Sequence, residues 1–323
     1  MTVARTSDRR KAAAWRKEHR MSKQDRETVG VIGLGSMGLG MAQTLAGKGF
    51  RTLGYDVSDA RCDAAAAVGV ERARTIGDVF ADASFVVFSL PSAREVEAVV
   101  KAPGGLLERK GAKRVIIIDT STSEPDISRT LAAELATAGH GFIDAPVSGG
   151  PLGASSGNLT MMIGGSEEEV ALARPVIEAM ASKILHVGPT GAGNVAKLVN
   201  NMLVAAHMIT TSEGLRLAAA AGVDPDSALR VVNAATGRSA LSEIHFPKWI
   251  MSERFDSGFS MGLMRKDVRL ARELAERVGV DLPIAQAVSR QWGPESDHLA
   301  DTDDFTRMGA VSSALASSSK KVA

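Results

Sequence analysis

The chain has 323 residues, of which 45% are hydrophobic and 23% charged, and its formal net charge is +1. The length suits two domains, and the near-neutral charge with only 4% aromatic residues argues against a nucleic-acid or membrane partner. A single cysteine, Cys62, excludes an internal disulfide and a thiolate metal cluster.

The sequence also lacks the patterns of a metal site, a membrane span and a secretory signal. The six His residues show no paired-ligand spacing, so we expect no metal. No apolar run approaches the roughly 20 residues that a membrane span needs. Without a secretory signal in the sequence, we expect a cytoplasmic protein.

The first 27 residues are rich in Arg and Lys and poor in apolar residues. They could be an organelle presequence or a nucleic-acid-binding arm, but Asp8, Glu18 and Asp25 argue against a presequence. We interpret residues 1–27 as a basic disordered tail.

A glycine-rich turn follows the first apolar strand, at residues 29–32. A helix pattern comes next, and a second strand at 52–55 ends on Asp56. This is the order of a dinucleotide-binding unit, in which the pyrophosphate lies at the helix N-terminus. The residues assigned to cofactor binding in this turn are Gly33, Leu34, Gly35, Ser36, Met37 and Gly38.

The acidic residue at the end of the second strand indicates which dinucleotide binds. A carboxylate at Asp56 would accept hydrogen bonds from the ribose hydroxyls and repel a 2′-phosphate. NAD is therefore the expected cofactor and NADP the less favoured one, although Arg61 lies close enough in sequence to soften the discrimination.

Further apolar strands at 85–90 and 114–118 predict a parallel sheet covered on both faces. Leu90-Pro91 and Ser121-Thr122 follow these strands, at the edge where such sheets bind ligands. The hydroxyl groups of Ser121 and Thr122 would either contact a ligand or cap the next helix. We expect a Rossmann-type, doubly wound, mostly parallel sheet over residues 28–189.

The stretch at 141–157 is dense in small residues and includes Ser148, Gly149 and Gly150. Its backbone amides could face a carboxylate closely. Alternatively, the stretch is a hairpin-like connection to the strand at 159–163.

Residues 190–318 predict an all-α domain, because helical patterns follow one another there without a convincing strand. Its first helix, near 30 residues long, would span the domain or a subunit interface. Lys197 shares a helical face with Asn200 or Asn201, so a cation and an amide converge. Lys266 would either reach an anion across the cleft or form a surface ion pair with Asp267.

Four motifs in order resemble the β-hydroxyacid dehydrogenase family, which includes 3-hydroxyisobutyrate and tartronate semialdehyde enzymes. The motifs are Gly33 to Gly38, Asp144 to Gly150, Gly191 to Asn201 and Lys266-Asp267, and the resemblance covers about residues 29–307. It implies a Rossmann domain, a long connecting helix and an all-α domain through which subunits pair as a homodimer or homotetramer.

The resemblance also implies roles for individual residues. Lys197 is similar to the catalytic Lys of the family, and Lys266 would approach the nicotinamide end of the cofactor. Glu95 departs from the family, since relatives carry Asn near the cofactor at that place. The residues that would hold the substrate carboxylate and hydroxyl are Ser121, Thr122, Ser148, Gly149, Gly150 and one of Asn200 and Asn201.

These features predict reversible hydride transfer between NAD and a small 3-hydroxy acid, with Lys197 exchanging the hydroxyl proton. Tartronate semialdehyde reduction is the alternative on the same scaffold, and an imine reductase is disfavoured by Lys197. Two non-catalytic alternatives are a nucleic-acid-associated relative that uses the basic tail, and a cofactor-binding protein without turnover.

Overall fold

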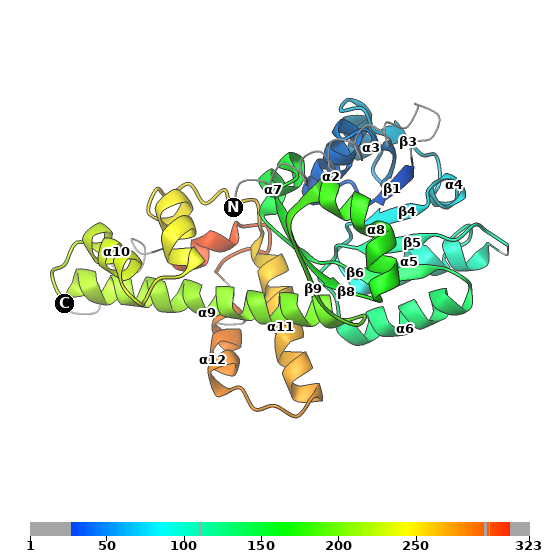
Figure 1. Ribbon diagram of the computed structural model, residues 1–323. Coiled ribbons are helices and arrows are strands. Elements are labelled where there is room, and N and C mark those ends of the chain that lie inside the picture. Colours follow the sequence, from blue (N-terminus) through cyan, green and yellow to red (C-terminus); the bar gives the residue numbers. More distant parts are fainter. Residues whose placement is uncertain (1–26, 110, 294–295, 297, 311–323) are drawn as a thin grey trace, which may run out of the picture.

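The computed structural model describes residues 27–310 except residues 110, 294–295 and 297. Residues 1–26 of the basic tail, and the end of the chain after residue 310, lie outside the described residues. Figure 1 shows an α/β part and a helical part joined by one long helix, α9 (Ala192–Ala220).

Nine strands of the described chain form one sheet in the order β3-β2-β1-β4-β5-β6-β8-β7, with β9 beside β8. The first six pair in parallel, β8 runs antiparallel to β6 and β7, and β9 is parallel to β8. This confirms the mostly parallel, doubly wound sheet. The strands are β1 Thr28–Ile32, β2 Arg51–Tyr55, β3 Glu71–Arg72, β4 Phe85–Phe88, β5 Ile116–Asp119, β6 Gly141–Asp144, β7 Val147–Ser148, β8 Leu159–Gly164 and β9 Ala181–Gly188.

Helices cover both faces of this sheet (Figure 1). Several begin at recognisable capping residues: Thr75 and Asp78 form a capping box on α4, and Ser166 caps α8. The helices are α2 Ser36–Gly47, α3 Asp59–Ala66, α4 Ile76–Asp82, α5 Ala93–Lys101, α6 Pro125–Thr137, α7 Gly150–Ser156 and α8 Glu167–Met180, with a short 3₁₀ turn η1 Leu106–Glu108.

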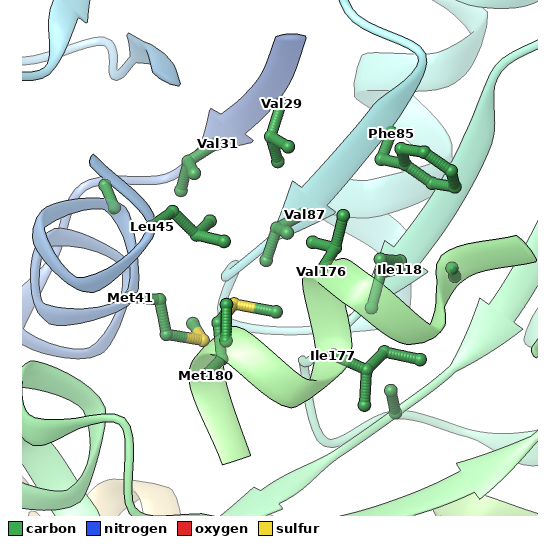
Figure 2. Packing of buried hydrophobic residues seen from close by; sticks show 14 of the residues in the cluster. Val29, Val31, Met41, Leu45, Phe85, Val87, Ile118, Val176, Ile177 and Met180 are labelled. Carbon is green, nitrogen blue, oxygen red and sulfur yellow. The ribbon is translucent and has the colours of Figure 1, made fainter. Parts of the chain in front are cut away.

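The core of the α/β part follows the two-residue alternation of the strands. Figure 2 shows one face, where strand side chains such as Val31 and Val87 lie between Leu45 of α2 and Val176 of α8, all fully buried. The alternate residues, such as Phe88, enter a second cluster under α4, α5 and α6. Two apolar layers therefore fix the sheet, and its carboxyl edge is left for polar residues.

The helical part packs around α9. The described chain contains no strand after residue 190, apart from one isolated bridge between Ser260 and Asp304, as the sequence predicts. The helix expected from about Ser239 is wider than an α-helix and contains Pro247, and the one expected from Asp304 is a short 3₁₀ helix. The remaining elements are α10 Pro225–Ala234, η2 Leu241–Ile250, α11 Met261–Arg277, α12 Pro283–Trp292 and η4 Phe305–Gly309.

The glycine-rich stretch after β6 forms the hairpin-like connection to β8 that was one of the two alternatives, and it also contains a helix. The short strand β7 pairs with β8, and helix α7 connects the two strands along the chain. Small residues make this possible, because a Cβ added at Gly40 of α2 would lie 2.9 Å from the Cβ of Ala154. The hydroxyl of Thr44 donates to the Ala154 carbonyl at 2.7 Å. The stretch is thus held against the cofactor helix α2.

Leu45 tests how much the buried layer contributes to stability. Its side chain is fully buried, so we expect Leu45→Ala to lower the free energy of unfolding by about 2–5 kcal/mol through lost contacts and a cavity. The matched variant Leu172→Ala on α8, where the residue is 46% exposed, should stay within about 0.5 kcal/mol. Equal losses in urea titrations would contradict this assignment of the core.

Candidate active site

The glycine turn between β1 and α2 has the backbone that a dinucleotide requires. Gly33 has φ +91, and a Cβ at Gly38 would lie 1.8 Å from the Gly33 carbonyl oxygen. A Cβ at Gly35 would meet nothing within 4 Å, so the face of the turn at this residue is open. No side chain caps the start of α2, which leaves its first amides for an anion. The residues present therefore fit a pyrophosphate.

Asp56 lies beside this turn, at the end of β2. The residue is 9% exposed, and its carboxylate accepts hydrogen bonds from the amides of Leu34 at 2.7 Å and Ser58 at 2.9 Å. The guanidinium of Arg61 is 3.4 Å from the same carboxylate. Oδ2 of Asp56 accepts from both Leu34 and Arg61, whereas Oδ1 accepts from Ser58 and has capacity left for a ribose hydroxyl.

The loops after β4 and β5 come together as the sequence predicts. The Leu90 amide donates to the Ser121 hydroxyl oxygen at 3.1 Å. The ammonium of Lys266 on α11 donates to the carbonyls of Pro91 at 2.9 Å and Thr122 at 2.8 Å. Lys266 thus ties the helical part to both loops.

The structure also bears on two other expectations for this region. Helix α6 has Glu124, not Ser121 or Thr122, at its N-cap position, so the capping hypothesis is wrong. Glu95 is exposed on α5 and accepts a hydrogen bond from the hydroxyl of Ser92, which caps that helix. Glu95 therefore binds the N-cap residue of α5 in this structure.

Lys197 lies on α9 and is 8% exposed. Its amine donates to the Val147 carbonyl at 2.9 Å, directly before Ser148, Gly149 and Gly150. Burial lowers the pKa of this amine below its ordinary 10.5; neighbouring Lys266 also lowers the pKa, while Asp267 raises it. A lowered pKa increases the share of neutral amine, which is the form that a general base requires.

The paired asparagines connect to a residue for which the sequence suggested only a surface ion pair. Asp267 is 1% exposed and accepts from the Asn201 amide at 2.6 Å, while Asn200 donates to Asn201 at 3.0 Å. The other oxygen of Asp267 is 3.4 Å from the Lys266 ammonium. The expected ion pair exists, but it is largely buried and belongs to the site.

Each half of the chain matches a known family. Residues 28–188 match the NAD binding domain of 6-phosphogluconate dehydrogenase, and residues 191–311 match the NAD-binding domain of NADP-dependent 3-hydroxyisobutyrate dehydrogenase. The 2-(hydroxymethyl)glutarate dehydrogenase of Eubacterium barkeri is 38% identical over 256 residues, 79% of this chain and 85% of the relative.

Two further relatives carry a different substrate in their names. The mitochondrial 3-hydroxyisobutyrate dehydrogenase of Mus musculus is 37% identical over 79% of this chain and 77% of its own length. A solved structure of Mycobacterium tuberculosis 3-hydroxyisobutyrate dehydrogenase with L-serine has a TM-score of 0.81 and 32% identity, over 90% of this chain and 99% of that chain.

The chain belongs to the 3-hydroxyisobutyrate dehydrogenase family. It is therefore an NAD(P)-dependent 3-hydroxyacid dehydrogenase that acts on a CH–OH group. Within the described residues, no group of His, Cys, Asp and Glu side chains is arranged to hold a metal. Helices of that part also lack the combination of length and apolar composition needed to cross a bilayer.

Two buried acids of the dehydrogenase were not assigned a role from the sequence. Asp119 and Asp144 end neighbouring strands and are partners in the register of β5 and β6. Burial raises the pKa of Asp119 to about 7 against hydrogen bonds from Ser121, and raises the pKa of Asp144 to about 6 against backbone amides. The signal for Asp119 in the sequence is an acid that ends an apolar strand, a pattern shared with ordinary turns, whereas Asp144 also stands first in the motif that runs to Gly150.

Asp119 should make the stability of the enzyme depend on pH. Because its folded pKa lies above the ordinary 3.8, the folded state binds the proton more tightly, and stability falls as pH rises from about 4 to 7. Asp119→Asn keeps an acceptor for the Ser121 amide and should remove this fall, which amounts to roughly 4 kcal/mol at most. The measurement is the free energy of unfolding of both proteins between pH 4 and pH 8.

The control is Asp126, whose pKa Arg277 and Arg129 lower. Its side chain is 49% exposed, so Asp126→Asn should lower the free energy of unfolding at pH 8 by less than about 1 kcal/mol. This difference between the two proteins should become smaller as pH falls. If both variants changed the pH dependence in the same direction, the assignment of Asp119 would be wrong.

Proposed function

We propose that the chain oxidises the hydroxyl of a small 3-hydroxy acid similar to 3-hydroxyisobutyrate, with NAD as cofactor and Lys197 as general base. The observation that carries the proposal is the buried Lys197 amine, 2.9 Å from the Val147 carbonyl and one residue from the small-residue loop. Bound NAD would supply a nicotinamide carbon that accepts the hydride.

The amine acts on the hydroxyl proton. Neutral Lys197 accepts that proton as the alcohol becomes a carbonyl, and in the reverse direction the ammonium returns it. Asp267 counters the effect of burial on the Lys197 pKa, so the amine can hold a proton after it has accepted one. Asn201, fixed by Asp267, would orient the hydroxyl through the hydrogen-bonding capacity that remains on its amide.

The carboxylate of the substrate would lie against Ser148, Gly149 and Gly150. Gly149 and Gly150 have φ values of +129 and +62, which L side chains rarely adopt, and neither residue has a side chain to cover its amide. The relatives named for 3-hydroxyisobutyrate and for 2-(hydroxymethyl)glutarate support this class, since each compound has its hydroxyl two carbons from a carboxylate. A small site with one amine and one carboxylate cradle suits that spacing.

NAD rather than NADP is favoured by Asp56. Its buried carboxylate would repel a 2′-phosphate, and the amides of Leu34 and Ser58 hold it in place. Arg61 weakens that repulsion, because its guanidinium is 3.4 Å away and half-exposed. A cytoplasmic location and a homodimer or homotetramer stay predictions.

The test of Lys197 separates binding from turnover. We expect Lys197→Ala to bind NAD with unchanged affinity and to lose roughly 10²–10⁴-fold in kcat, since only proton transfer is removed. The assay follows reduced cofactor with a panel of 3-hydroxy acids that includes the alcohol product of tartronate semialdehyde reduction. The exposed Lys183 on β9 provides the control Lys183→Ala, and substantial turnover by Lys197→Ala would refute the proposal.

A pair of variants tests the cofactor preference. Asp56→Asn should narrow the ratio of kcat/KM for NAD over NADP by on the order of tenfold, as expected for one nearby charge. Arg61→Ala should widen the same ratio by removing the counter-charge. A ratio that moves the same way in both variants would show that another residue discriminates.

A further inference from the structure

The start of helix α9 is held by a carboxylate from another element. Asp144, at the end of β6, is fully buried and accepts hydrogen bonds from the amides of Gly191 at 2.6 Å and Asn194 at 2.9 Å. The residue at the N-cap of α9 is Gly191, which has no side chain, and the first turn contains no acid. Asp144 therefore supplies both the cap and the negative charge that a helix start favours.

Glycines around this carboxylate allow the helix to lie directly on the sheet edge. A Cβ added at Gly193 would be 2.4 Å from the Met162 carbonyl oxygen and 2.9 Å from the Asp144 carboxylate. A Cβ at Gly164 would be 2.5 Å from the same carboxylate. The position of the first turn of α9 is thus set by backbone contact as well as by hydrogen bonds.

Asn194 connects the same turn to the loop after β5 and to helix α6. Its fully buried side chain accepts from the Ser123 amide at 3.2 Å and donates to the Ser128 hydroxyl at 3.0 Å. Lys197 is three residues further along the helix and shares its face. The backbone that follows Asp144 also carries Val147, whose carbonyl receives the Lys197 amine.

We propose that Asp144 is a positioning residue for Lys197: by holding the first turn of α9 it keeps the amine buried beside the small-residue loop. The inference rests on the proposed function of Lys197 as general base. Asp144 itself contacts neither the amine nor the proposed substrate cradle, so it acts through the helix.

Loss of the Asp144 anchor should change both the pKa and the position of the Lys197 amine. Because the pKa of Lys197 depends mainly on burial, a shift of α9 that admits water would return the pKa toward its ordinary value. Asp144 is not among the charges that shift the Lys197 pKa, so neutralising Asp144 should change that pKa only through position. Misplacement of a catalytic group by about 1 Å can lower a rate by about 10²-fold.

The experiment disturbs the anchor in two independent ways. Asp144→Asn replaces one acceptor oxygen by a donor that faces an amide, whereas Gly193→Ala pushes the turn off the Met162 carbonyl. The control is Gly214→Ala in the same helix, where an added Cβ meets nothing within 4 Å. The readouts are hydrogen exchange of the Gly191 and Asn194 amides in the protein without cofactor, NAD affinity, kcat, KM and the pH profile of kcat.

We expect both anchor variants to exchange these amides faster, to bind NAD normally and to lose roughly 10-fold to 10²-fold in kcat. Their kcat should also need a higher pH for alcohol oxidation, because a more hydrated amine has a higher pKa. Gly214→Ala should match the unaltered enzyme in every readout. In the unaltered protein, the two amides should exchange as slowly as those in the middle of α9.

Three results would overturn the proposal. One is fast exchange of the Gly191 and Asn194 amides in the unaltered protein, which can be measured even if a variant fails to fold. The second is a folded Asp144→Asn or Gly193→Ala with normal kcat and pH profile. The third is a loss of kcat with an unmoved pH profile and unchanged amide exchange. Lys197→Ala separates failure of the positioning role of Asp144 from failure of the proposed function. Retained turnover in Lys197→Ala would reject the proposed function itself.

Discussion

The proposed site depends on the desolvation of the Lys197 amine. Lys197 is nearly fully buried, and burial is the largest cause of its lowered pKa. An ammonium is costly to desolvate, so the surrounding structure must hold the side chain there. The Val147 carbonyl and the neighbouring Asp267 supply partners, while Lys266 adds a repelling charge. The balance keeps the amine able to exchange a proton.

The two parts of the chain meet where that balance is set. Lys266 on α11 donates to the carbonyls of Pro91 and Thr122, so a residue of the helical part fixes both loops of the sheet edge. Further along α11, Arg277 forms an ion pair with Asp126 at the start of α6. These contacts, together with the anchored start of α9, orient the helical part over the end of the sheet where the proposed reaction takes place.

Much of this arrangement is readable in the sequence where one residue type has one physical meaning. The glycine turn at 33–38 and the acid Asp56 predict the cofactor unit, because backbone approach and helix start leave few alternatives. The spacing of Lys197 and the paired asparagines likewise predicts a shared helical face. Loops after parallel strands meet at one edge, which places Ser121 beside Leu90.

The sequence is silent where a residue's role depends on a distant partner. The glycines at 191 and 193 suggest close approach by a backbone or a ligand, and the structure shows that Gly193 lies against the backbone of β8 and the carboxylate of Asp144. Asp144 belongs to a motif of the family, but its hydrogen bonds to the start of α9 involve partners some 50 residues away and cannot be read from that motif. The sequence does not predict helix α7 either, since its Gly- and Ser-rich residues have little intrinsic helix propensity.

The most direct test of this account is the pKa of the Lys197 amine in the protein without cofactor. It can be measured by NMR of isotopically labelled lysine, with the signal assigned through Lys197→Arg. The account predicts a pKa clearly below the ordinary 10.5, because the buried site disfavours the charged form. A pKa at or above 10.5 would mean that the amine is protonated at working pH, and would contradict its role as the base.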